Sequence, residues 1–284
     1  MMKKIREILA EAAQEALKNI IDSILKPSNN SVEQKSDGGI VTSADLTADK
    51  LLKEKLSTYG TVYSEEDENQ EKITNAYNNG DSFFLIDPID GSTAFNQVLI
   101  KVRTLQQLGI WESCSDAEKR SIVVGDYTVQ IAYLEQKKSL AAAVATPRGL
   151  TFSGVVGQGL YLNGKELQNS SLAKCGLGKP IGAIGHPIKM DTNALMQQWK
   201  KQFGSISVQR LGAIGAELVR LLCGEISLYV SGEEKLWDAL PAEALCLAAG
   251  LGVERGEVVK GRSILVMWNP NHIREFWKPS IPLL

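Results

Sequence analysis

A short apolar segment that ends in two acidic residues constrains the fold of this 284-residue chain more than any other feature. Residues 82–86 are compact and apolar, as is typical of a buried strand, and Asp87 follows directly. Pro88 then separates Asp87 from Asp90. Two carboxylates held this close resist joint ionisation unless a cation neutralises them. Mg²⁺ is the natural cation, because it prefers oxygen ligands.

The residues around the second acid predict a phosphate site beside the metal. The Ile89 carbonyl can converge with both carboxylates if the proline turns the chain. Gly91, Ser92 and Thr93 can begin a short helix, whose free N–H groups and positive dipole end accept a phosphate. The alternative interpretation is that Asp-Pro and Asp-Gly are ordinary turn dipeptides and that Ser-Thr is a helix cap.

Two acids elsewhere in the chain strengthen the metal interpretation. Glu65 is the first acid after the strand-like run 61–63, and strand ends deliver ligands in α/β proteins. Its neighbours in the same acidic run have the simpler explanation of a solvated surface. Asp238 begins an apolar helix, where a carboxylate can act both as the helix N-cap and as a metal ligand.

Hydrophobic periodicity predicts an α+β half over residues 1–157 and an α/β half over residues 158–284, separated by a glycine-rich region. Apolar residues at helical spacing predict helices at 5–24, 48–56, 192–202, 214–222 and 239–249. Alternating or β-branched residues predict an antiparallel meander over 105–111, 122–134 and 140–146. Further strands are expected at 61–63, 82–86, 206–208, 226–230 and 264–267.

Composition excludes several classes of partner. The 31 basic and 33 acidic residues form no long block of one sign, so nucleic acid is not expected to bind. The start of the chain is basic but lacks the apolar core of a signal peptide, and no apolar run has membrane-spanning length. The four cysteines are far apart and form no zinc or redox motif. We therefore expect a soluble, cytoplasmic protein that does not bind a membrane.

Four motifs in order resemble the inositol monophosphatase superfamily of lithium-sensitive, magnesium-dependent phosphatases. They are Asp37-Gly38-Gly39-Ile40-Val41-Thr42-Ser43-Ala44-Asp45, Ser64-Glu65-Glu66, Asp87-Pro88-Ile89-Asp90-Gly91-Ser92-Thr93 and Trp237-Asp238. Segments 157–165 and 210–216 extend the resemblance over most of the chain. The resemblance implies a layered α-β-α-β-α sandwich of the type shared with fructose-1,6-bisphosphatase. It also implies a small phosphorylated metabolite as the partner and a possible homodimer.

The resemblance also implies roles for individual residues. The implied metal ligands are Glu65, Asp87, the Ile89 carbonyl, Asp90 and Asp238. Glu65, Ser92 and Asp45 are the implied catalytic residues: the first two activate a water nucleophile, and Asp45 helps hold a further, weaker magnesium. Two or three Mg²⁺ ions are expected per site, with Li⁺ inhibitory and Ca²⁺ able to replace Mg²⁺ without activity. The expected substrate and phosphate contacts are Asp90, Gly91, Ser92, Thr93, Ser231, Lys235 and Asp238.

Departures from the family pattern leave the substrate open. Residues 96–103 replace the usual segment after Phe95, and Ser231 stands where inositol-specific members carry an acid. Glu233 and Glu234 are interpreted as part of a solvated loop, in which Lys235 is the better candidate for a substrate contact. The leading hypothesis is hydrolysis of inositol monophosphate or a related sugar phosphate. The alternatives are a 3′-phosphoadenosine 5′-phosphate phosphatase and a non-catalytic metabolite-binding relative.

Overall fold

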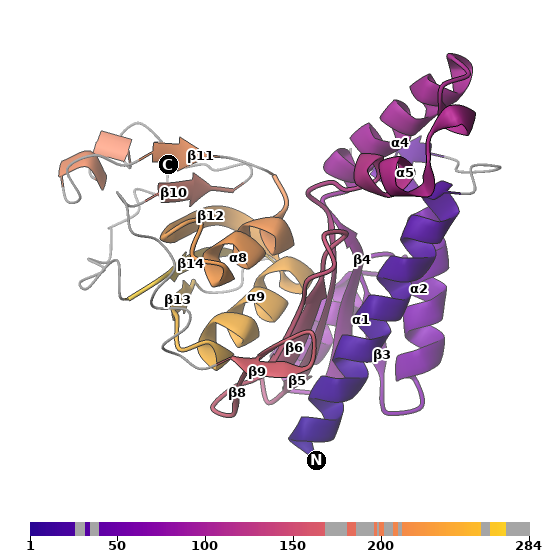
Figure 1. Cartoon of the computed structure of the whole chain (residues 1–284). Helices are drawn as coiled ribbons and strands as arrows, with labels where there is room; N and C mark the ends of the chain where they lie inside the picture. The colour runs from indigo at the N-terminus through magenta and orange to yellow at the C-terminus, as the bar shows by residue number, and fades with distance from the viewer. Residues whose placement is uncertain are drawn as a thin grey trace.

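The computed structural model stacks helices and sheets in layers (Figure 1). It describes residues 1–25, 32–34, 40–167, 181–185, 196–197, 199–201, 207–209, 212–256 and 262–270. In that part of the chain, no helix combines the length and the apolar character needed to cross a membrane. The layered α/β arrangement confirms the fold predicted from the sequence.

Helices α1 (Met2–Leu25) and α2 (Ser43–Leu56) form the outer layer on one face of the larger sheet. The apolar face of α1, spaced as predicted, packs into a core that includes the buried residues of α2. Thr42 and Asp45 form a capping box that starts α2 upstream of the predicted 48–56 helix. A two-stranded hairpin of β1 (Val32–Gln34) and β2 (Ile40–Thr42) leads into that helix.

A seven-stranded sheet follows in the order β3-β4-β5-β6-β7-β8-β9, in which only β3 and β4 are parallel neighbours. Its strands are β3 (Val62–Ser64), β4 (Phe83–Asp90), β5 (Thr128–Glu135), β6 (Lys138–Ala145), β7 (Thr151–Val155), β8 (Gly159–Leu162) and β9 (Lys165–Leu167). The sheet thus runs past residue 157, through the glycine-rich region. The division of the chain into two halves at that residue stays a prediction.

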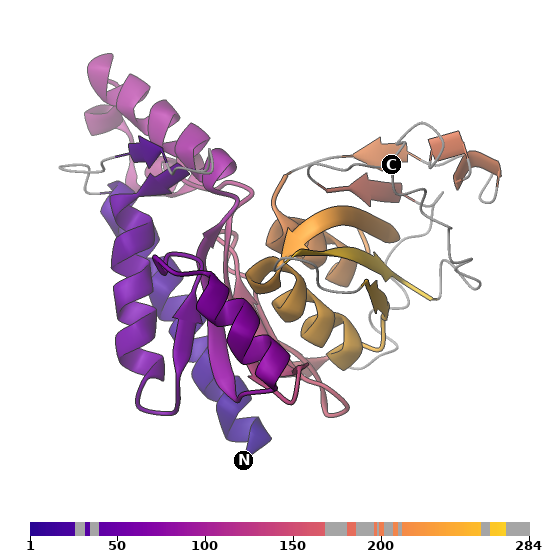
Figure 2. The same ribbon diagram turned by 180° about the vertical axis from the view of Figure 1, so that it is seen from behind.

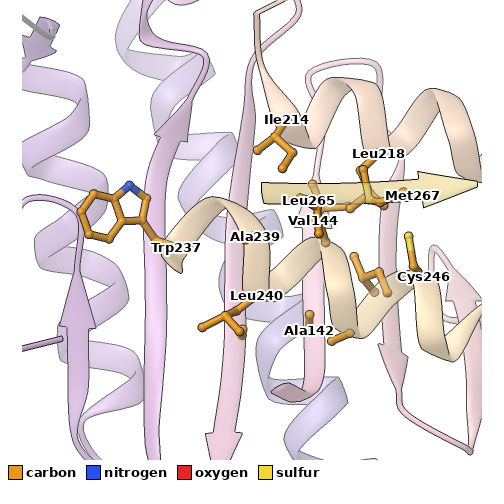
Figure 3. Close-up of a cluster of buried hydrophobic side chains, with 14 of the residues drawn as sticks. Ala142, Val144, Ile214, Leu218, Trp237, Ala239, Leu240, Cys246, Leu265 and Met267 are labelled. Carbon is orange, nitrogen blue, oxygen red and sulfur yellow. The ribbon is translucent and has the colours of Figure 1, made fainter. Parts of the chain in front are cut away.

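A smaller, five-stranded sheet follows in the chain, in the order β11-β10-β12-β14-β13. Its strands are β10 (Ile181–Ile184), β11 (Ser207–Gln209), β12 (Leu228–Lys235), β13 (Gly252–Arg255) and β14 (Arg262–Trp268). Between the two sheets lie α8 (Ile214–Leu222), α9 (Leu236–Ala248) and α3 (Glu71–Asn79), whose buried side chains share one core. Figure 2 shows α3 beside the larger sheet, on the side that faces the smaller sheet. In Figure 3, Leu218 of α8 and Leu240 of α9 lie in one core with Val144 of the larger sheet and Met267 of the smaller sheet.

The strand predicted at 105–111 is wrong. The last turn of helix α4 (Ser92–Gln107) covers the start of that region, and the 3₁₀ turn η1 (Trp111–Ser113) and α5 (Asp116–Ile122) follow. The buried residues of α4 recur at helical spacing, at positions 95, 98, 99 and 102, and this period prevails over the local alternation. The meander therefore begins only at Thr128, and the strand expected at 122–134 is shortened. The helix predicted at 192–202 lies largely outside the described residues.

Candidate metal centre

Strand β4 carries the first two acids of the site at its carboxyl end, and all eight of its residues are buried. In a regular strand, residues three apart point to opposite faces of the sheet. The pairing of β4 with β5 shifts register between Asp87 and Asp90, where Pro88 has no N–H to donate. This irregularity allows both carboxylates to reach the same side. Oxygens of Asp87, Asp90 and Asp238 all lie within 4.8 Å of one another.

Asp238 reaches this cluster from the first turn of α9, which lies between the two sheets. The expectation that Asp238 is the N-cap is wrong, because α9 begins at Leu236 and Lys235 occupies the cap position without a side-chain cap bond. The helix starts three residues earlier than predicted, directly after the strand β12. An acid in the first turn still interacts favourably with the positive end of the helix dipole.

Asp90 is held by three donors. The Gly215 N–H and the Thr128 hydroxyl donate to Oδ2 at 2.7 and 3.0 Å, and the Ile214 N–H donates to Oδ1 at 3.2 Å. Burial raises the pKa of Asp90 from 3.8 to about 7, although the hydrogen bonds from Gly215 and Thr128 lower it. The charges of nearby carboxylates raise this pKa further. Asp90 thus joins the end of β4 to the beginning of α8.

The other two carboxylates are also destabilised as anions. Burial raises the pKa of Asp87 and of Asp238 well above the ordinary value, and the neighbouring carboxylates add to both shifts. Oδ1 of Asp87 is buried and has no hydrogen-bond partner among the described residues. An orphaned carboxylate oxygen beside two further carboxylates suits a divalent cation with oxygen ligands. The donor set present therefore fits Mg²⁺.

Glu65 lies next to this cluster, at the turn that follows β3. Its backbone N–H donates to the Ile86 carbonyl at 3.1 Å, which ties the turn to β4. Its carboxylate raises the pKa of Asp87 both by its charge and through a hydrogen bond between the two side chains. The structure thus brings Glu65 to Asp87, as the strand-end argument predicts, although it is not one of the three mutually close acids.

The segment after Asp90 turns sharply into α4. Gly91 precedes the helix at φ 85°, and a Cβ there would lie 2.8 Å from the Asp126 carbonyl oxygen, so glycine is required. Ser92 is the first helical residue, and its hydroxyl donates to the Ile89 carbonyl at 3.2 Å. Thr93 follows and is exposed. A helix does begin at this corner, but it runs on to Gln107 and is not short.

Asp45 is buried and participates in the cap of α2. Its Oδ2 accepts the Thr42 N–H at 2.8 Å, and the Thr42 hydroxyl bonds to the same oxygen. Asp45 is not a member of the group formed by the three mutually close carboxylates. Its predicted role at a further magnesium stays a prediction.

Glu234 is a site residue that sequence reasoning missed. It belongs to β12 and not to a solvated loop, and the pairing of β12 with β14 is irregular between Ser231 and Glu234. The Tyr229 hydroxyl donates to Oε1 of Glu234 at 3.0 Å, and the buried Ser231 hydroxyl donates to the same atom. Burial raises the pKa of Asp238, and the charge of Glu234 raises it further, so the Glu234 carboxylate lies near Asp238. Regular strand alternation through Tyr229 and Ser231 would point to residue 233, so the sequence pattern gave no signal for Glu234.

Lys235, the last residue of β12, supplies positive charge close to the cluster. Its Nζ lies 4.9 Å from the centroid of the Trp237 ring. The charge of Lys235 lowers the pKa of Asp238, in opposition to burial and the surrounding acids. Lys235 therefore lies near Asp238, and its role as a substrate contact stays a prediction.

The carboxylate cluster suits a divalent cation, and the start of α4 next to Asp90 can accept an anion such as phosphate, a combination typical of metal-dependent, phosphate-handling proteins. The sequence model of the inositol monophosphatase family matches residues 1–267. The chain therefore belongs to this family. No curated protein sequence matches the chain significantly. The family match supports a phosphatase with a metal site.

Solved structures show the same fold. The extragenic suppressor protein SuhB from Bartonella henselae has a TM-score of 0.67 at 18% identity, with 95% of each chain covered. An inositol monophosphatase/NADP phosphatase complexed with Mg²⁺ and phosphate has a TM-score of 0.64 at 17% identity, covering 92% of this chain and 89% of that one. A staphylococcal inositol monophosphatase, soaked in 100 mM LiCl as an inhibitory complex, gives 0.64 at 18% identity, covering 96% and 93%.

Proposed function

We propose that this protein is a Mg²⁺-dependent phosphomonoesterase that hydrolyses inositol monophosphate or a related sugar phosphate. The observation that carries the proposal is the cluster of Asp87, Asp90 and Asp238, whose oxygens lie within 4.8 Å of one another. Membership of the inositol monophosphatase family supports it. The Mg²⁺ and phosphate bound to a structurally similar phosphatase support it further.

The three clustered acids, with Glu65 and the Ile89 carbonyl, would hold the metal. When bound, Mg²⁺ supplies positive charge that polarises the phosphate and lowers the pKa of a water ligand. Glu65, beside Asp87, would accept the proton of the attacking water. The Ser92 hydroxyl, which is bonded to the Ile89 carbonyl, would orient that water.

The free N–H groups at the start of α4 would bind the phosphate of the substrate. Gly91 brings the chain into the helix, and Ser92 and Thr93 begin it. Their N–H groups have no acceptor within the first turn of the helix and point along its positive dipole end. Phosphate recognition would thus lie directly beside the carboxylates that hold the metal.

The polar residues of β12 support a polyol as the alcohol part of the substrate. Glu234 is fixed by two hydroxyl donors and is directed at the cluster, where it can accept hydrogen bonds from substrate hydroxyl groups. Ser231 and Lys235 flank it. A fixed carboxylate repels a second phosphate, whereas Lys235 attracts one, so a bisphosphorylated nucleotide remains the second candidate.

Phosphate release from a panel of phosphate esters, measured with and without Mg²⁺, tests the proposal. We expect phosphate release from inositol 1-phosphate or from a sugar phosphate, and no release when Mg²⁺ is removed. By analogy with the staphylococcal complex, we also expect inhibition by Li⁺. Turnover of 3′-phosphoadenosine 5′-phosphate alone would favour the second candidate. Equally low activity in the wild type and in Asp90→Asn would instead indicate a non-catalytic metabolite-binding protein.

A further inference from the structure

Gln130 is a buried amide in the middle of β5 whose hydrogen-bonding groups are both unused. Its side chain has no exposed surface. Neither its amide nitrogen nor its amide oxygen has a hydrogen-bond partner among the described residues. Burying an amide without partners is costly, and nearly all buried polar groups in folded proteins are paired with protein or ordered water. The position therefore calls for a partner other than the described residues, such as an ordered water.

The location of Gln130 indicates that its partner lies next to Asp87. Gln130 is paired in register with Asp87 across the β4–β5 ladder, so the two side chains stand on the same face of the sheet. Oδ1 of Asp87 is likewise buried without a partner among the described residues. Two unsatisfied polar groups thus stand on directly opposed positions of neighbouring strands, and they do not bond to each other.

The surroundings of Gln130 place its amide against the metal cluster. Thr128, two residues earlier on the same face of β5, donates to Asp90. A Cβ added at Gly215 would lie 3.1 Å from Cδ of Gln130 and 2.8 Å from Oδ2 of Asp90. The amide is therefore covered by the first turn of α8 and lies close beside the Asp90 carboxylate.

We propose that Gln130 is a positioning residue for the metal site, joined to Asp87 through a buried water. The amide would donate to that water, and the water would donate to Oδ1 of Asp87 and fix the orientation of this carboxylate toward Mg²⁺. A buried water requires two to four polar partners, and Mg²⁺ retains several waters when bound. Groups that orient metal ligands in this way typically contribute 10- to 100-fold to metal affinity. The inference rests on the proposed function, because it assumes that Mg²⁺ binds at the cluster.

The test is the substitution Gln130→Met, which keeps the length of the side chain and removes both polar atoms. We expect the dissociation constant for Mg²⁺, measured by titration calorimetry, to rise by about 10-fold or more. The melting temperature of the magnesium-free protein should stay within about 3 °C of the wild type or rise, because the substitution removes unpaired buried groups. The Mg²⁺ concentration that gives half-maximal phosphatase activity should rise in parallel.

Ser139→Ala is the matched control. Ser139 is also buried, its hydroxyl also lacks a partner among the described residues, and it lies at the opposite end of the sheet, next to the β5–β6 turn. This substitution should leave Mg²⁺ affinity unchanged. Magnesium affinity within twofold of wild type in Gln130→Met would overturn the inference, as would a large loss of stability without Mg²⁺, which marks a packing role. A wild type that binds Mg²⁺ but hydrolyses no ester would refute the proposed function and leave this measurement valid.

Discussion

The N–H of Gly215 donates to Oδ2 of Asp90 at 2.7 Å, so a backbone group of α8 is bonded to an acid at the end of β4. The two residues are 125 positions apart in the sequence. The first turn of α8 therefore orients a carboxylate at the end of β4. The closeness of this approach depends on the absence of a side chain at Gly215.

Gly215→Ala should disrupt that approach. The added Cβ would lie 2.1 Å from the Thr128 hydroxyl oxygen and 2.8 Å from Oδ2 of Asp90, so α8 must move away from the site. We expect the free energy of unfolding to fall by about 1–3 kcal/mol and Mg²⁺ affinity to fall with it. Chemical denaturation and titration calorimetry measure the two effects.

Gly60→Ala serves as the control for this substitution. A Cβ at Gly60 would contact only the Phe84 ring, at 3.4 Å, which is an ordinary van der Waals distance. Its effect on Mg²⁺ affinity should be negligible. If Gly215→Ala also left both stability and Mg²⁺ affinity unchanged, the bond between Gly215 and Asp90 would not position the carboxylate.

Asp90→Asn removes one negative charge from the cluster while nearly preserving the shape of the side chain. We expect at least about a 100-fold loss of phosphatase activity, since even groups that only orient metal ligands contribute 10- to 100-fold. Asp238→Asn should behave in the same way, because its oxygens lie in the same group. Glu66→Gln should be milder, because Glu66 is outside that group. Near-normal turnover in Asp90→Asn would refute its role as a ligand.

The stability of the magnesium-free protein should fall as the pH rises through about 7. Burial raises the pKa of Asp90 to about 7 from an ordinary value of 3.8, so the folded state holds a proton that the unfolded state releases. This contribution to stability is complete below about pH 4 and is lost as the pH passes the folded pKa. Thermal unfolding between pH 5 and pH 8 should show a declining melting temperature, and Mg²⁺ should restore it at pH 8. A melting temperature independent of pH would contradict the origin assigned to the shift.

The sequence was sufficient for the features that depend on local pattern. The buried strand that ends at Asp87 and Asp90 and the helix α8 follow from apolar runs and helical spacing, and they lie where predicted. The layered fold also agrees with the resemblance to the inositol monophosphatase superfamily. These features are encoded within single segments of the chain.

Features that depend on contacts between distant segments could not be predicted. The strand expected at 105–111 is replaced by the end of α4, because buried contacts at helical spacing upstream decide the structure. Glu234 bonds to Tyr229 and Ser231 and lies near Asp238 at a point where the pairing of β12 is irregular. Gln130 gains its position from the register of β5 against β4. Register and irregular pairing are properties of the assembled sheet.

Lys53→Met should loosen the turn that carries Glu65. Nζ of Lys53 lies 2.8 Å from Oδ2 of Asp49 and 2.7 Å from Oδ1 of Asp67. The other oxygen of Asp67 accepts the Ser64 N–H at 2.8 Å, immediately before Glu65. Removing the ammonium leaves two partly buried carboxylates without their cation, so we expect a loss of about 1–3 kcal/mol in the free energy of unfolding.

Lys50→Met on the same helix separates this effect from a general loss of charge. Lys50 and its partner Glu54 are largely exposed and 4.0 Å apart, so the substitution should change stability by less than about 0.5 kcal/mol. Activity should fall in Lys53→Met and stay unchanged in Lys50→Met, since only Lys53 is connected through Asp67 to the Glu65 turn. Chemical denaturation and magnesium-dependent phosphate release, measured on both variants, test the connection. Equal effects of the two substitutions would show that the ion pairs of Lys53 do not hold Glu65 in place.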